Sequence, residues 1–401
     1  MSANRISQRI AAIAESATLK VDAKAKALKA EGKDVISFAA GEPDFATPQH
    51  IVEAAVLAVR DPKNHRYTPA AGLPELREAI VEKTKRDSGT EVAASQVIVT
   101  NGGKQAVYQA FAVILDPQDE VLVPAPYWTT YPEAIRLAGG VPVEVFAGAD
   151  QNYKVTVEQL ETARTPKSKV LLFVSPSNPT GSVYSKEELA ALVKVFEKYP
   201  DIYILSDEIY EHINFVGGHQ SMAQFDFIKD RVITINGVSK GFAMTGWRLG
   251  YIAANKEIAA ANDKMQGQTT SGTCSIAQRA GIVAYEQGLE TVLEMKKSFA
   301  RRRELVYNLL NEIPGVKTNM PDGAFYFFPE ISSFFGKKDP DGNTIKDSAD
   351  LALYLLNFGH VATVGGDSFG NNNYIRLSYA ASDESLVEAL RRIKEALGKL
   401  S

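Results

Sequence analysis

Short runs of consecutive apolar residues alternate along the chain with stretches of helical periodicity. Six such runs occur between residues 97 and 235, and a seventh follows at 249–253: Val97–Thr100, Glu120–Val123, Val141–Phe146, Val170–Val174, Ile202–Leu205, Val232–Ile235 and Leu249–Ala253. Several are apolar at successive positions, which is typical of strands covered on both faces. The pattern predicts an α/β fold with a mainly parallel, seven-stranded type of sheet and helices on both faces.

The two ends of the chain have a different texture. Ile6, Ile10 and Ile13 fall at helical spacing and open an arm, rich in alanine and lysine, that continues to Gly32. Towards the C-terminus we expect a charged helix, three short strands and a closing helix, at residues 290–311, 323–328, 361–364, 374–378 and 382–399. We therefore predict a large domain at 47–287 and a smaller α+β domain at 288–401, to which residues 1–46 contribute an arm.

Composition narrows the classes of protein and of partner. The net charge is −4 and hydrophobic residues make up 45% of the chain, so bulk charge gives no reason to expect a nucleic acid partner. The single cysteine, Cys274, excludes an intrachain disulfide. No run of about 18 apolar residues or signal-peptide core is present, so we expect a cytoplasmic protein without a membrane partner.

No metal site is expected either. His212 and His219 lie near Glu208 and Glu211 but without a recognised ligand spacing, which favours a packed or solvated role. The polar loop at 337–347 begins like a calcium loop, yet it has threonine where that loop needs glycine, and it is predicted to be a surface insertion.

Polar segments directly follow three of the predicted strands. They are Ser175–Gly181, Ser206–Tyr210 and Gly237–Arg248. Ligands of open α/β sheets bind at the carboxyl ends of strands, so these segments are the candidate site. Each also has a plain structural explanation: the first is a turn, the second a helix start capped by Ser206 or Asp207, and the third carries a solvated lysine.

Taken together, the three segments match the needs of one cofactor. Pyridoxal phosphate requires an amine for its aldehyde, an anion for its ring nitrogen, and donors for its phenolate oxygen and its phosphate. Lys240, Asp207, Asn178 with Tyr210, and Arg248 supply these groups in that order. We therefore predict Lys240, Asp207 and Tyr210 as catalytic residues.

The chain resembles the fold-type I (class I/II) pyridoxal-phosphate-dependent aminotransferases, in the branch that contains bacterial aspartate aminotransferases. The resemblance covers nearly the whole chain from Ile6 onward. Besides the three segments above, it is carried by Gly41–Phe45, Tyr67 with Pro69 and Gly72, Gly102–Gln105, Pro126–Trp128 and Ile375–Ser378.

The resemblance implies roles at the cofactor. Trp128 matches the aromatic residue that stacks on the cofactor ring. The loop of Gly102, Gly103 and Lys104 matches the phosphate-binding loop that precedes a helix. Tyr67 matches a residue that reaches the phosphate bound by the neighbouring subunit, which implies a homodimer.

The resemblance also implies a substrate. Arg376 matches the arginine that grips the α-carboxylate, beside Gly41, Asn178 and Trp128. Lys104 is the candidate for a distal carboxylate, with Ser16 and Thr18 as neighbours, although it can instead serve only the phosphate loop or the surface. The implied function is a ping-pong exchange of amino groups between aspartate or glutamate and the 2-oxo acids oxaloacetate and 2-oxoglutarate. Prephenate, aromatic and small neutral amino acids are the alternatives.

The sequence departs from the aminotransferase pattern at one position, and it also allows one alternative function. Many relatives have serine or threonine at the position of Gly237, contacting phosphate, and Ser239 is the candidate replacement. Residues 237–241 also fit the G-x-S-x-G elbow of α/β-hydrolases, with Ser239 as nucleophile and His360 as the one later histidine. That hypothesis leaves Asp207 and Asn178 without a function.

Overall fold

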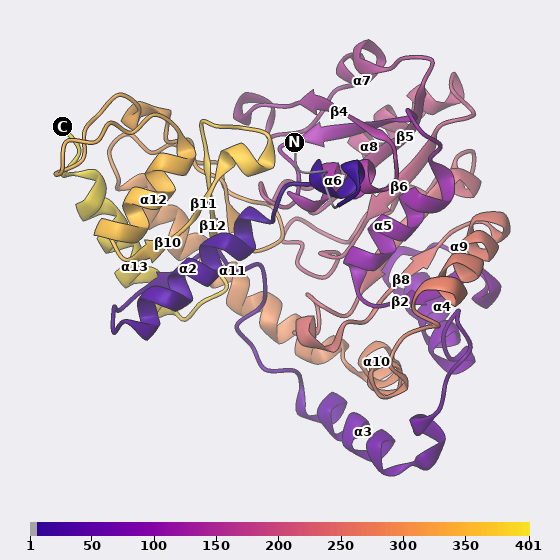
Figure 1. Ribbon diagram of the computed structural model, residues 1–401. Helices are drawn as coiled ribbons and strands as arrows, with labels where there is room; N and C mark the ends of the chain where they lie inside the picture. Colours follow the sequence, from indigo (N-terminus) through magenta and orange to yellow (C-terminus); the bar gives the residue numbers. More distant parts are fainter. Residues whose placement is uncertain (1–5) are drawn as a thin grey trace.

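The computed structural model describes residues 6–401, and its central element is a single sheet of seven strands (Figure 1). The strands are β2 (Val97–Thr100), β3 (Glu120–Ala125), β4 (Val141–Phe146), β5 (Ser168–Val174), β6 (Tyr203–Asp207), β7 (Val232–Gly237) and β8 (Gly250–Ala253). Their order is β2-β8-β7-β6-β5-β3-β4, and β8 runs antiparallel to the other six strands. The predicted α/β class and mainly parallel sheet are confirmed.

Helices cover both faces because successive strand side chains point to opposite sides. Leu172 of β5 packs in the cluster formed with α5 (Gly103–Ile114), α6 (Thr130–Leu137) and α9 (Lys256–Thr269). Leu171, its neighbour in sequence, packs on the other side with α7 (Val157–Ala163) and α8 (Lys186–Val193). Continuous apolar runs therefore mark these strands in the sequence.

The edge of the sheet at β2 is covered by three further helices. These are α3 (Gln49–Arg60), α4 (Pro74–Ser88) and α10 (Ser275–Gln287). Val97 and Val99 of β2 share one buried cluster with Leu76 and Ile80 of α4.

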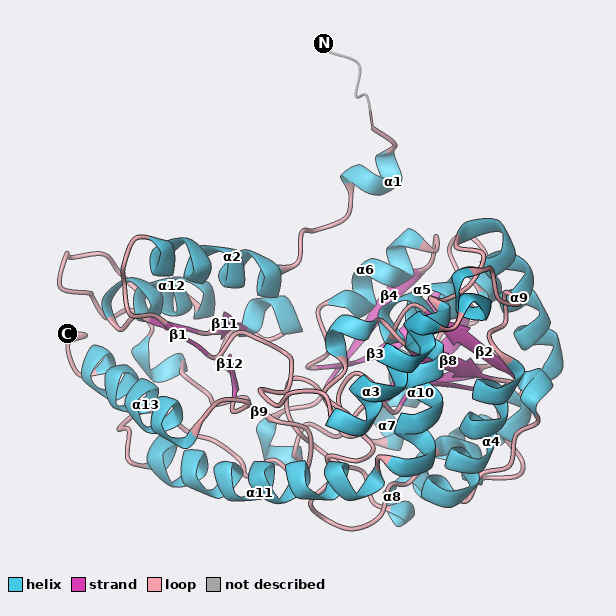
Figure 2. Cartoon of the chain, turned by 90° about the horizontal axis from the view of Figure 1, so that it is seen from below, coloured by secondary structure: helices cyan, strands magenta, loops and turns pink. Residues whose placement is uncertain are grey.

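A second group of elements combines both ends of the chain (Figure 2). Strand β1 (Ile36–Ser37) pairs in parallel with β10 (Val361–Ala362), and β11 (Val364–Gly365), β12 (Ile375–Ser378) and β9 (Tyr326–Phe327) form an antiparallel sheet. The helices of this group are α2 (Ala17–Ala30), α11 (Leu289–Asn311), α12 (Ser348–Phe358) and α13 (Asp383–Leu397). The predicted helices near 290–311 and 382–399 are present.

Two expectations about local structure differ from the outcome. The N-terminal arm is not one helix: α1 (Gln8–Ala11) ends early, and α2 starts anew where the Ser16 hydroxyl accepts a hydrogen bond from Leu19 N at 3.4 Å. The run at 361–364 is not one strand, because β10 and β11 pair with partners in different sheets.

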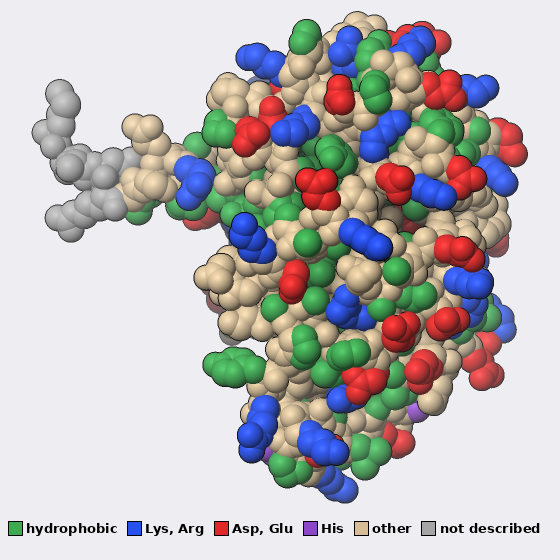
Figure 3. Space-filling model, turned by 90° about the vertical axis from the view of Figure 1, so that its right-hand side faces the viewer, with side chains coloured by type: hydrophobic (Ala, Val, Ile, Leu, Met, Phe, Trp, Pro, Cys, Tyr) green, Lys and Arg blue, Asp and Glu red, His purple; other side chains and the backbone are tan. Residues whose placement is uncertain are grey.

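The surface gives two plain observations. Within residues 6–401, no helix combines the length and apolarity needed to cross a membrane. On the face shown in Figure 3, acidic and basic side chains are interspersed rather than separated.

Candidate active site

The three polar segments identified in the sequence meet because β5, β6 and β7 are adjacent and parallel. Val174 pairs in register with Asp207, and Asp207 pairs with Ile235. The segments that follow the strands line one pocket, together with residues from the N-terminal arm and from β12. Of the predicted site residues, the pocket is lined by Gly41, Gly103, Lys104, Trp128, Asn178, Asp207, Tyr210, Ser239, Lys240, Arg248 and Arg376.

Two predicted residues are outside this lining. Gly102 lies directly behind it, against the guanidinium of Arg248. Tyr67 is 95% exposed on the surface, so it does not contribute to the pocket of its own chain.

Lys240 follows β7 in a turn, and its amine donates a hydrogen bond to the carbonyl oxygen of Gly41. Burial in the pocket wall, reinforced by the positive charge of Arg376, lowers the pKa of Lys240 to about 8. An amine with such a pKa is unprotonated in an appreciable fraction near neutral pH, which makes it a competent nucleophile and base.

Asp207 ends β6 and is 4% exposed. Its Oδ2 accepts a hydrogen bond from the Tyr131 hydroxyl at 2.9 Å, and its Oδ1 accepts one from Ile209 N at 3.2 Å. Burial raises the pKa of Asp207 to about 6, although both hydrogen bonds act in the opposite direction. No helix starts here, because turns occupy residues 209–212, so the alternative of a helix cap is wrong.

Glycines shape the wall of the pocket at the start of α5. Gly102 has φ +81°, and a Cβ there would lie 2.5 Å from the Arg248 guanidinium. A Cβ on Gly250 would lie 2.7 Å from Gly103 N, and one on Gly237 would lie 2.8 Å from the Cα of Gly250. The side chain that many relatives carry at position 237 would therefore collide with β8, whereas Ser239 lines the pocket.

Arg376 of β12 is 1% exposed and faces the same pocket. It donates to Asn178 Oδ1 at 3.0 Å and to the carbonyl oxygen of Ala39 at 2.7 Å, while its Nε has no partner among the described residues. A buried guanidinium with an unused N–H suits a ligand carboxylate.

Lys104 provides a further cation, from the first turn of α5. Its Nζ lies 5.1 Å from the ring centre of Trp128. Burial, followed by the charge of Arg248, lowers the pKa of Lys104. Ser16 and Thr18 line the same pocket, as expected from their suggested proximity to Lys104.

The charges and donors of this pocket fit pyridoxal phosphate. Lys104, Lys240, Arg248 and Arg376 are four cationic side chains in one lining that also contains Asp207. Like charges of this kind are costly unless an anion joins them. The α5 N-terminus with Arg248 suits a phosphate, Asp207 suits a protonated ring nitrogen, and Lys240 suits an aldehyde.

Two tyrosines of the pocket were not predicted. Tyr131 lies three residues after Trp128, at helical spacing, and its hydroxyl contacts Asp207. Tyr326 hydrogen-bonds through its hydroxyl to that of Tyr210 at 2.8 Å, and the Arg376 guanidinium lies 4.6 Å from its ring centre. Tyr326 lies in the run at 323–328, which the sequence predicts only as a strand of the smaller domain.

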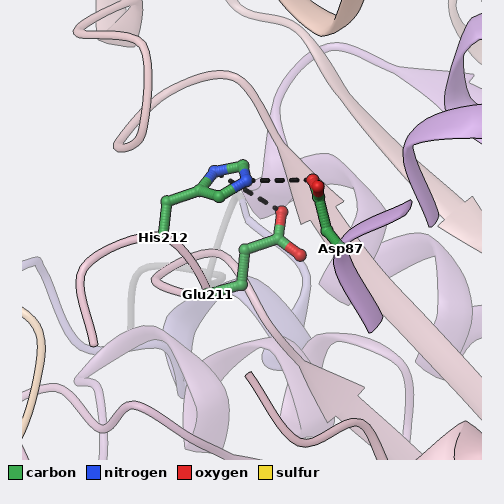
Figure 4. A group of neighbouring side chains, drawn as sticks. All are labelled: Asp87, Glu211 and His212. Atoms are coloured by element: carbon green, nitrogen blue, oxygen red, sulfur yellow. Dashed lines mark hydrogen bonds and ion pairs between the residues drawn. The ribbon is translucent and has the colours of Figure 1, made fainter. Parts of the chain in front are cut away.

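A separate cluster contains Asp87, Glu211 and His212 (Figure 4). His212 Nε2 lies 3.0 Å from Asp87 Oδ2, and its Nδ1 lies 3.7 Å from Glu211 Oε1. Although this trio has the spacing of metal ligands, the ammonium of Lys83 pairs with Glu211 and lies 3.9 Å from Asp87. The cluster is therefore a network of ion pairs that already contains its cation.

We expect Lys83→Met to destabilise the fold by about 3–5 kcal/mol, because it leaves the buried carboxylate of Glu211 without its cation, whereas Asp87 keeps Arg86 as a partner. Burial disfavours the charge of Asp87 and Glu211, but their partners outweigh it and lower the pKa of both groups. This stability is present above their unfolded pKa values and is lost as pH falls through the folded ones, so the deficit should be largest near neutral pH. Urea unfolding at several pH values measures it.

The matched control is Lys85→Met, since Lys85 is 65% exposed in the same helix. This control should change the free energy of unfolding by less than about 0.5 kcal/mol. Equal losses in both variants would contradict a structural role for the buried network.

Comparison with known proteins finds one family over most of the chain. The family described as "Aminotransferase class I and II" matches residues 33–393. An aspartate aminotransferase of Streptomyces avermitilis is 52% identical over 98% of this chain and 97% of its own, and an aspartate/prephenate aminotransferase of Cereibacter sphaeroides is 44% identical over 99% of both. The crystal structure of the Rhizobium meliloti aspartate aminotransferase superimposes with a TM-score of 0.95 at 41% identity, covering 100% of both chains.

The hydrolase hypothesis does not survive. Ser239 lines the pocket, but His360 does not, and the backbone carbonyl of His360 instead accepts a hydrogen bond from Ile36 N beside β1. The matching family is one of aminotransferases, and the relatives above are named as aminotransferases.

Proposed function

Because the chain belongs to the class I and II aminotransferase family, we propose that it exchanges amino groups between aspartate or glutamate and the 2-oxo acids oxaloacetate and 2-oxoglutarate. The observation that carries this proposal is the pair of cations, Arg376 and Lys104, that line one pocket with Lys240. Two cations suit the two carboxylates of an acidic amino acid. The names of the Streptomyces and Rhizobium relatives support the same substrate.

The cofactor in this proposal is pyridoxal phosphate. Arg248, Ser239 and the loop of Gly102 and Gly103 would hold its phosphate, and Tyr67 of a second subunit would add a donor. Trp128 would pack on its ring, and Asn178 with Tyr210 would donate to its phenolate oxygen. When bound, the cofactor supplies an aldehyde that accepts the amino group and a ring that accepts electrons.

The residues of this chain orient the substrate and move its proton. Arg376 and Asn178, beside Gly41, hold the α-carboxylate, which fixes the α-hydrogen relative to Lys240. The Lys240 amine, with its lowered pKa, would serve as the base that takes up that proton and as the acid that returns it. Asp207 would keep the ring nitrogen protonated, and the exchange would be completed by a second 2-oxo acid in a ping-pong cycle.

Selectivity for acidic substrates rests on Lys104. Its ammonium lies against Trp128 and is not paired with a carboxylate among the ion pairs of residues 6–401. A distal carboxylate would supply that partner, with Ser16 and Thr18 as further donors. Prephenate is the second candidate substrate, because it also carries a second carboxylate and the relative from Cereibacter sphaeroides is named for it.

We expect Lys104→Met to slow the half-reactions of aspartate and glutamate by about 10- to 100-fold, because it removes a charge-assisted contact to the distal carboxylate. The rate with alanine should change by less than about threefold. Stopped-flow absorbance of the bound cofactor measures each half-reaction, and Lys264→Met on the exposed side of α9 is the matched control. Faster conversion of alanine or phenylalanine than of either acidic donor by the unmodified enzyme would overturn the substrate proposal.

The assembly, compartment and domain division are part of the same proposal. The exposed Tyr67 supports a homodimer, in which each subunit completes the site of the other. We propose a cytoplasmic enzyme that acts on small amino acids and 2-oxo acids. We propose domain boundaries near residues 46 and 287, and the pairing of β1 with β10 supports the assignment of the N-terminal segment to the smaller domain.

A further inference from the structure

Tyr131 is a buried side chain that the function described so far does not use. It lies in the first turn of α6 and is 1% exposed. Its hydroxyl donates to Asp207 Oδ2 at 2.9 Å, a contact that joins residues 76 positions apart. Among the described residues, this carboxylate oxygen has its side-chain donor in Tyr131, while the other oxygen uses the backbone of Ile209.

The same tyrosine also supports the wall that faces the cofactor ring. Its ring packs edge-on against Trp128, with centroids 5.3 Å apart and an interplanar angle of 89°. One side chain therefore contacts both the group proposed to hold the ring nitrogen and the group proposed to pack on the ring. Burial, followed by the charge of Asp207, raises the pKa of Tyr131 well above its usual value, so the phenol remains a proton donor.

We propose that Tyr131 is a positioning residue that orients the Asp207 carboxylate and keeps it ionised, and thereby holds the proton on the ring nitrogen of the bound cofactor. This inference rests on the proposed function. The buried carboxylate tends to become neutral, and it does so by taking the proton of its partner nitrogen. The phenol donates to the ionised form, which favours the carboxylate with a protonated ring over the neutral pair.

The test uses Tyr131→Phe, which keeps the ring against Trp128 and removes only the hydroxyl. Holoenzyme is prepared with pyridoxal phosphate labelled with ¹⁵N in its ring, and the nitrogen signal is recorded at pH 7. In the unmodified enzyme we expect the shift of a protonated ring nitrogen. In the variant we expect the signal to move towards the unprotonated value, and kcat to fall by about 10- to 100-fold while cofactor stoichiometry is kept.

Tyr251→Phe is the matched control. Tyr251 is also a buried tyrosine, but its hydroxyl contacts Lys83 at 3.4 Å and is not in the pocket lining. The ¹⁵N signal of the cofactor in the Tyr251→Phe variant should equal that in the unmodified enzyme. An unchanged signal in Tyr131→Phe would overturn the positioning role while leaving the proposed function intact, whereas failure of the unmodified enzyme to bind the cofactor would overturn the proposed function.

A second measurement needs no variant of Tyr131. In the cofactor-free enzyme, protonation of Asp207 near pH 6 should perturb the near-ultraviolet absorbance of Tyr131 through their hydrogen bond. The perturbation should be missing in Asp207→Asn. Identical pH-difference spectra for the two proteins would also overturn the proposal.

Discussion

Replacing Lys240 with alanine is expected to abolish the visible absorption band of the bound cofactor and to reduce turnover by about five orders of magnitude or more. Lys240 lines the pocket with Asp207, and its amine contacts Gly41. Within residues 6–401, the one other lysine of the pocket lining is Lys104. Absorbance spectra and steady-state assays measure the two effects.

Lys186→Ala is the control, because Lys186 is exposed at the first position of α8. Its absorption band and turnover should match those of the unmodified enzyme. Normal turnover in Lys240→Ala would refute the assignment of Lys240.

The same variant tests the proposed dimer. Mixed with Tyr67→Ala under conditions of subunit exchange, it should form hybrids in which one site has both intact residues and the other has neither. At equal amounts, random exchange restores about a quarter of the unmodified activity. No recovery despite demonstrated exchange would show that Tyr67 does not act across a subunit interface.

Asp207→Asn is expected to lower turnover by about three to five orders of magnitude, since a neutral amide cannot hold the ring nitrogen in its protonated form. The stability of the fold should be affected far less than turnover. The amide oxygen can still accept the hydrogen bond from Ile209, and the Tyr131 hydroxyl can turn to accept one from the amide nitrogen, so we expect a change of about 1 kcal/mol in the free energy of unfolding. Half-reaction kinetics and urea unfolding on the same preparation separate the two.

Asp226→Asn serves as the control for this substitution, because the Asp226 side chain is 93% exposed. A loss of turnover below about tenfold in Asp207→Asn would mean that the carboxylate only organises the turn after β6. The absence of a helix at this turn already removes the simplest structural explanation for an aspartate here.

The large sheet was predictable because all of its strands except β4, at the edge, are buried at most of their positions. Runs such as Val170–Val174 and Val232–Ile235 are apolar at nearly every position, and each coincides with a strand. The strands of the smaller sheets were harder to predict. β9, β10 and β11 have two residues each, and their pairing depends on partners that lie far away in the sequence.

The site was predictable where its residues follow consecutive strands of a parallel sheet. Asn178, Asp207 and Lys240 meet for that reason. Tyr131 was missed because a tyrosine on an amphipathic helix is usually core, and only the three-dimensional fold shows that its hydroxyl contacts Asp207. The exposed Tyr67 shows a different limit, because a single chain does not contain the site that it would complete.

The close packing of Gly102, Gly237 and Gly250 has a consequence for engineering the substrate range. These positions bring the backbones of β7, β8 and the α5 start so close that even one methyl group meets main-chain or guanidinium atoms. Libraries that vary them would sample collapsed pockets instead of new specificities. Side chains of the N-terminal arm, including Ser16, Thr18 and Leu19, also line the pocket, and they can be varied without displacing any strand.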